Sequence, residues 1–116
     1  MTPTQLNHFR QRLETLCFEL RDINEKAGES TRPVQLDQAS VGRLSRMDAL
    51  QMQAMALETQ RRRQAQLKLA KMALKRIDSG EYGICIACEE DINPRRLEFD
   101  LTASLCIACA SAREQS

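Results

Sequence analysis

The chain has 116 residues, enough for one compact domain or for an extended element joined to a small module. It contains no Trp, three Phe and one Tyr, so few large side chains are available for a thick core. The formal net charge is +1, and the absence of any run of about eighteen apolar residues excludes a membrane-spanning helix. The N-terminus lacks the apolar segment of a signal peptide, and we therefore expect a cytoplasmic protein.

The small net charge hides a strong asymmetry along the chain. Residues 1–40 carry five basic and six acidic side chains, residues 41–77 carry nine and two, and residues 78–116 carry three and eight. The local balances are therefore −1, +7 and −5. This pattern indicates a basic central segment between two acidic ones.

The first 27 residues have the pattern of a helix that packs along a partner helix. Thr2 is placed as an N-cap, Pro3 as the first helical residue, and Gln5 completes a capping box. Gly28 is a plausible end of the helix. Apolar residues recur at alternating steps of three and four, as in an a/d heptad seam: Leu6, Phe9, Leu13, Leu16, Leu20, Ile23 and Ala27.

A second and longer helix is predicted after an interruption at residues 29–40. Pro33 disfavours helix at the residue before it, and Asp37 and Ser40 are N-cap candidates. Residues 41–79 contain no proline, and a helix of that length spans about 58 Å. Two long helices with a short connection predict an antiparallel coiled-coil hairpin over residues 1–79, with its tip near residues 30–48.

Four cysteines in two CxxC pairs, Cys85 with Cys88 and Cys106 with Cys109, are separated by seventeen residues. In a reducing compartment this spacing favours one structural Zn²⁺ over iron, redox dithiols or free cysteines. Four sulfur ligands leave no open position for water, so metal-based hydrolysis is not expected. We therefore predict an all-α protein in which residues 80–116 form a small zinc module that ends in a short helix.

The residues around the cysteines resemble the DksA/TraR family of bacterial transcription regulators. The resemblance rests on "GEYGIC" before the first pair, "RRLE" between the pairs, and "TASLCIAC" at the second pair. It implies a non-enzymatic regulator whose coiled coil enters the secondary channel of RNA polymerase without touching DNA. It also implies that the coiled-coil tip approaches the catalytic centre, and that the nucleotide ppGpp is a candidate co-effector.

The predicted tip departs from the family pattern. Active members carry an acidic D-x-x-D-x-A motif there, and nothing between Pro33 and Ala49 matches it. Asp37 is also explained as a helix cap, and Asp48 as a solvated charge or an ion-pair partner. The candidate tip contacts are Asp37, Arg43, Ser45, Arg46 and Asp48.

Two other functions are compatible with the sequence. The basic stretch from Arg61 to Arg76 suits a nucleic-acid-binding zinc protein or a phosphate site, although part of it is expected to pair with carboxylates of the first helix. The methionines Met47, Met52 and Met55 favour an adaptable packing surface, and as a partner-binding stripe they also suit a self-associating coiled-coil adaptor. Direct DNA reading by the acidic zinc module is not expected, and we predict a monomer.

Overall fold

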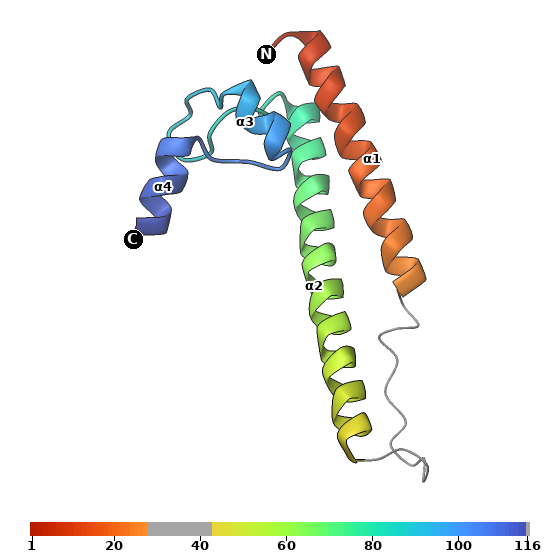
Figure 1. Cartoon of the computed structure of the whole chain (residues 1–116). Coiled ribbons are helices and arrows are strands. Elements are labelled where there is room, and N and C mark those ends of the chain that lie inside the picture. Colours follow the sequence, from red (N-terminus) through yellow and green to blue (C-terminus); the bar gives the residue numbers. More distant parts are fainter. Residues whose placement is uncertain (28–42, 116) are drawn as a thin grey trace.

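The protein is a helical hairpin joined to a small cysteine-containing module. The structure is a computed structural model and describes residues 1–27 and 43–115. Figure 1 shows α1 and α2 antiparallel, α3 beside the C-terminal end of α2, and α4 projecting away from the hairpin. The expected all-α architecture is confirmed. The helices are α1 (Pro3–Ala27), α2 (Arg43–Ser79), α3 (Pro94–Phe99) and α4 (Ile107–Gln115).

The start of α1 follows the predicted capping box. The backbone N–H of Thr2 donates to Oε1 of Gln5 (3.0 Å), and the N–H of Gln5 donates to Oγ1 of Thr2 (3.2 Å). Each side chain therefore satisfies a backbone donor that the first helical turn leaves without a partner. The helix begins at Pro3, as predicted, whereas Gly28 lies outside the described residues.

The predicted heptad seam of α1 packs against small side chains of α2. Phe9 and Leu13 are 1% and 0% exposed, and they share a core cluster with Ala70, Ala73 and Ile77 of α2. Alanine at two of these positions allows the helix axes to approach closely. Cys17 of α1 belongs to the same buried cluster.

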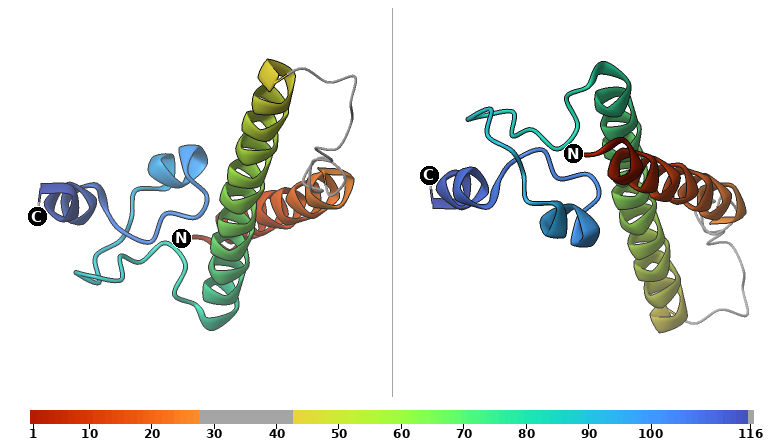
Figure 2. Two further views of the ribbon diagram at one scale, coloured as in Figure 1. Left: turned by 90° about the horizontal axis from the view of Figure 1, so that it is seen from below. Right: turned by 90° about the horizontal axis from the view of Figure 1, so that it is seen from above.

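The two long helices diverge toward the tip of the hairpin, as both views in Figure 2 show. Ile23 belongs to the heptad pattern but is 43% exposed, because α2 is further from α1 at this level. The side chain of Arg63 donates to Asn24 across the hairpin at 3.1 Å. In an antiparallel pair this contact places Ala27 near residue 60, so about 25 Å of α2 extends beyond the end of α1.

Charges on α2 are paired differently from the expectation. We expected part of the basic stretch that begins at Arg61 to pair with carboxylates of the first helix. Instead, Arg61 and Arg62 contact Glu58 one turn away on their own helix, at 2.7 and 3.2 Å. Asp22 of α1 pairs with Lys26 on the same helix at 3.0 Å. Side chains three or four residues apart on one helix are already neighbours, so forming an ion pair between them does not require the two helices to be held together.

The short helix α3 was not predicted. Asn93 and Pro94 are the N-cap and first residue of this six-residue helix. The Asn93 side chain accepts a hydrogen bond from the backbone N–H of Arg95 at 2.9 Å. Asparagine followed by proline favours both a turn and a helix start, and six residues are too few to show a helical period.

One hydrophobic core joins the hairpin to the cysteine module. Leu97 of α3, together with Tyr82 and Cys85 of the preceding loop, belongs to the same buried cluster as Phe9 and Leu13 of α1. Their exposed fractions are 0% for Leu97, 4% for Tyr82 and 0% for Cys85. In the described part of the chain, no helix is long and apolar enough to cross a membrane.

Candidate metal centre and hairpin tip

The four cysteines of the two CxxC pairs come together in one cluster. Their sulfur atoms all lie within 4.8 Å of one another, and the Sγ atoms of Cys88 and Cys106 are 3.8 Å apart. Four sulfurs placed about 2.3 Å from a central Zn²⁺ in a tetrahedron are about 3.8 Å from each other. The cluster Cys85, Cys88, Cys106 and Cys109 therefore has the size that one tetrahedral zinc requires.

A short hairpin of backbone positions the first cysteine pair. The N–H of Ile92 donates to the carbonyl of Gly83 (2.7 Å), and the N–H of Cys85 donates to the carbonyl of Glu90 (2.8 Å). Gly83 has a φ of +83°, a conformation that glycine adopts without steric cost. The turn between these strands of backbone presents Cys85 inward, at 0% exposure, and leaves Cys88 exposed.

The second cysteine pair lies at the start of α4. Cys106 directly precedes the helix and Cys109 is in its first turn. The backbone N–H of Cys109 lies 3.4 Å from the Cys106 sulfur, and the N–H of Ala110 donates to the Cys106 carbonyl at 2.9 Å. Because the N-terminal N–H groups of a helix favour negative charge, this position suits a thiolate.

The thiol pKa values show a donor set arranged for a cation. Backbone N–H groups of Cys106 and Cys88 lower the pKa of Cys85 to about 6. The neighbouring sulfurs of Cys106, Cys88 and Cys85 raise the pKa of Cys109 to about 12. Backbone N–H groups stabilise the Cys85 thiolate, whereas repulsion from the neighbouring sulfurs opposes ionisation of Cys109. A divalent ion at the centre would remove this repulsion, and the residues present fit Zn²⁺.

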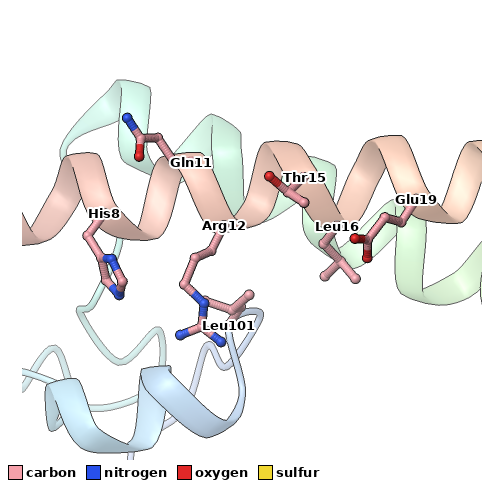
Figure 3. A pocket seen from close by; sticks show the side chains of 7 residues that line it. All are labelled: His8, Gln11, Arg12, Thr15, Leu16, Glu19 and Leu101. Atoms are coloured by element: carbon pink, nitrogen blue, oxygen red, sulfur yellow. The ribbon is translucent and has the colours of Figure 1, made fainter.

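Glu98 of α3 makes polar contacts between the module and α1. One of its carboxylate oxygens lies 3.0 Å from Nε2 of His8, and the other accepts a hydrogen bond from Arg12 at 2.5 Å. Figure 3 shows His8 and Arg12 pointing from α1 toward α3 and the loop of Leu101, across a groove of about 460 Å³. His8, the one histidine of the chain, therefore has a structural contact. No sequence pattern indicated its partner ninety residues away.

Further hydrogen bonds fix the loop between α3 and α4. The hydroxyl of Tyr82 donates to the carbonyl of Leu101 at 2.8 Å, and Nε of Arg96 donates to the carbonyl of Leu105 at 3.0 Å. The N–H of Ile86 donates to the carbonyl of Ser104 at 2.9 Å, which connects the two cysteine pairs. The second pair is thus held in place by contacts with both the hairpin and the first pair.

The candidate tip residues lie far from the cysteine cluster, at the opposite end of α2. Arg43 is the first residue of this helix, and Ser45, Arg46 and Asp48 follow in its first turns with exposed side chains. The structure therefore brings four of the five candidates to one end of the hairpin. The fifth candidate, Asp37, lies outside the described residues.

Comparison with known proteins identifies the family. Residues 80–115 match the prokaryotic dksA/traR C4-type zinc finger. The RNA polymerase-binding transcription factor DksA of Escherichia coli K12 is 33% identical, with 98% of this chain and 74% of the relative covered. The DksA of Salmonella typhimurium is 32% identical over the same shares.

A solved structure extends the likeness to three dimensions. The transcription factor DksA2 from Pseudomonas aeruginosa superimposes with a TM-score of 0.81 and 28% sequence identity. The match covers 99% of this chain and 87% of that one, so it includes the hairpin as well as the cysteine cluster. The chain therefore belongs to the DksA/TraR family, and its four cysteines form that family's C4-type zinc finger.

Proposed function

We propose that this protein is a non-enzymatic transcription regulator that binds RNA polymerase. The proposal is supported by relatives at 32–33% identity over 98% of the chain, each named as an RNA polymerase-binding transcription factor. Its one Zn²⁺ has a structural role and is held by Cys85, Cys88, Cys106 and Cys109. The protein acts as a monomer in the cytoplasm, the compartment in which the polymerase is found.

The hairpin is proposed to enter the secondary channel of the polymerase tip first. The single observation that carries this step is the length of α2, which reaches from the cysteine module to Arg43 and continues about 25 Å beyond α1. The molecule measures 63 × 33 × 19 Å, so its long dimension is that of a rod and not of a globule. A narrow rod with its wide module at one end suits insertion into a channel to a fixed depth.

The tip residues are proposed to contact the polymerase interior. Ser45, Arg46 and Asp48 are exposed at this end of α2, and Arg43 and Asp37 precede them in the chain. The family's paired acidic motif is absent, so binding to the polymerase and an effect on initiation are separate questions for this chain. We expect the carboxylates of Asp37 and Asp48 to affect transcription more than they affect binding.

Binding of the zinc-loaded protein to core RNA polymerase tests the proposal. We expect saturable binding that a known secondary-channel ligand displaces, and little binding to duplex DNA. A second arm adds ppGpp, with GDP as the control, and tighter polymerase binding with ppGpp alone would identify it as a co-effector. The proposal fails if the polymerase does not bind. Steeply salt-dependent DNA binding would then favour the nucleic-acid function, and concentration-dependent sedimentation would favour the adaptor.

A further inference from the structure

The outer side of α1 carries an exposed aromatic ring in a row with two carboxylates. Phe18 is 70% exposed, and it follows the buried Phe9 by about two and a half helical turns, so it points away from α2. Asp22 and Glu25 follow Phe18 at steps of four and three residues, which places the three side chains in one row along the helix. These three residues are the acidic row.

The rest of the described molecule does not cover the acidic row. In Figure 3, Arg12 points toward α3, whereas Gln11 points away from it. Phe18 comes about two helical turns after Gln11 and therefore lies on the same side of α1. Glu25 is exposed and makes no ion pair with another described residue, and Asp22 pairs only with an exposed lysine one turn away on its own helix. The acidic row is thus accessible to a partner.

A row of three lysines on α2 has the same spacing. Lys68, Lys71 and Lys75 are separated by three and four residues, their side chains are exposed, and none of them forms an ion pair within residues 1–27 and 43–115. Arg76 faces the zinc module, where it donates to the carbonyl of Thr102 at 3.5 Å. The three lysines lie about 80–140° around the helix from Arg76, so the module does not cover them. These three residues are the lysine row.

We propose that the acidic row of one copy of this protein binds the lysine row of a second copy. An antiparallel alignment places the members of the two rows opposite each other in pairs: Glu25 with Lys68, Asp22 with Lys71, and Phe18 with Lys75. Two of these pairs join opposite charges, and the third places an ammonium group against an aromatic ring. This inference does not rest on the proposed function.

The side chains beside the two rows are compatible with this alignment. Arg21 is an exposed cation next to the acidic row, and it falls opposite Met72, which is 49% exposed, and not opposite a lysine. The aliphatic part of an arginine side chain packs well against an apolar surface. Within one molecule α1 and α2 are already antiparallel (Figure 1), so a second hairpin can add beside the first in the same orientation.

The proposed contact is open-ended, because the two rows are different surfaces of one chain. Each contact leaves one row unoccupied on each of the two copies, so further copies can add, and the assembly does not stop at a symmetric dimer. A contact between two helix faces is at the small, transient end of protein interfaces, so we expect association in the micromolar to millimolar range. The monomer remains the form proposed to act on the polymerase.

Two other partners fit the rows less well. The phosphates of a nucleic acid suit the lysine row, but they leave Phe18 and the two carboxylates of the acidic row without a partner. A basic segment of another protein suits the acidic row and leaves the lysines unpaired. A second copy of the chain satisfies both rows with matching spacing. The two other partners are outcomes of the test.

Sedimentation velocity of the zinc-loaded protein over a concentration series measures the association. We expect the weight-average mass to rise with concentration above that of one chain, 13.2 kDa, without a plateau at the mass of a dimer. It should return toward 13.2 kDa in about 1 M NaCl, where the screening length is about 3 Å. A mass of one chain at every concentration would overturn the inference. The samples contain no polymerase, so this result leaves the proposed function to its own assay.

Two charge-reversal variants test the pairing of Glu25 with Lys68. Glu25→Lys and Lys68→Glu each place like charges opposite each other, so each variant alone should associate about tenfold more weakly than the wild type, or weaker still. An equal mixture should associate to within about threefold of the wild type, because each contact then joins the two changed side chains or the two native ones. A mixture that stays monomeric, or single variants that associate like the wild type, would contradict the inference.

Both charge reversals are expected to leave the fold intact. The two side chains are exposed, and lysine and glutamate have similar helix propensities. Zinc content and melting temperature should therefore match those of the wild type in each variant, so a loss of association reports the contact between copies and not unfolding.

Phe18→Ser removes the aromatic part of the acidic row. Its matched control is Met55→Ser, because Met55 is also 70% exposed but belongs to neither row. We expect association to weaken about threefold or more in Phe18→Ser and to stay unchanged in Met55→Ser. The reverse result would assign self-association to the methionines of α2 and overturn the inference. Binding of a single-stranded oligonucleotide that Lys68→Glu abolishes, without self-association of the wild type, would assign the lysine row to nucleic acid and overturn it as well.

Discussion

Truncating Leu97 tests whether the hairpin and the zinc module unfold as one unit. Leu97 is 0% exposed and shares a core cluster with residues of α1, α2 and the loop before Cys85. In Leu97→Ala, the cavity is therefore created at the junction and not inside either part. If the core is continuous, this single change destabilises the long helices and the cysteine cluster together.

The expected loss of stability follows from the buried atoms. Leu→Ala removes three carbon groups, and at about 0.8 kcal/mol each their burial contributes about 2.4 kcal/mol. A cavity that does not collapse increases such losses to roughly 3–5 kcal/mol. For a domain of this size, with a shift of about 4 °C per kcal/mol, the melting temperature should fall by roughly 10–20 °C.

Two signals followed in the same thermal scan make the assay decisive. Far-UV circular dichroism reports the long helices, and a colorimetric zinc indicator reports the module. We expect both transitions of Leu97→Ala to move down together, and Leu69→Ala, at an α2 side chain that is 48% exposed, to change stability by only about 0.5 kcal/mol. Loss of zinc at lower temperature with an unchanged helix transition would refute the continuous core.

Three further outcomes are expected. Cys106→Ser should reduce bound zinc from one equivalent to nearly none and unfold the module, as measured by metal analysis and circular dichroism. Burial raises the pKa of Tyr82 to about 12, above its ordinary value of about 10, so the stability that its protonated form contributes is complete below about pH 10 and is lost between about pH 10 and 12. Tyr82→Phe should make urea unfolding less sensitive to alkaline pH, and should cost about 1 kcal/mol near neutral pH because the Leu101 carbonyl loses its donor. Asp37→Ala and Asp48→Ala should leave zinc content and helicity intact, and an unchanged polymerase-dependent transcription assay would mean that the carboxylate is only a cap or a surface charge.

Local signals in the sequence were enough to predict α1 and the cysteine cluster. The capping box of Thr2 and Gln5 needs only residues three apart, and a CxxC pair needs only one turn. Both features are decided by neighbouring residues, so tertiary packing does not change them. The end of α2 at Ser79, beside a glycine with φ +79°, is predictable for the same reason.

Features that depend on distant residues could not be predicted in the same way. On α2, Leu69 and Met72 are 48% and 49% exposed, whereas the smaller Ala70 and Ala73 are fully buried. The close approach of α1 decides which side of α2 is buried. The hydrophobic pattern of α2 alone does not predict that side. The partners of Glu98 lie 86 and 90 positions earlier in the chain, where no periodicity connects them.

The junction explains how a metal site can matter for a tip that lies at the other end of the molecule. The ion pair of Arg12 with Glu98 is partly exposed, at 38% and 48%, and a pair of this kind contributes about 1 kcal/mol or less. The buried packing of Leu97 and Tyr82 contributes several times more to the free energy of unfolding. Apolar contacts therefore hold the module against the hairpin, while Glu98 selects the register of α1. Cys85 belongs to the same core, and we therefore expect a change in the cysteine cluster to alter the angle between the module and the helical hairpin. A change in this angle displaces the tip of the hairpin, and the displacement grows with the distance from the module to the tip. Under the proposed function, substitutions in the junction are accordingly expected to weaken polymerase binding, although none of the changed residues belongs to the tip.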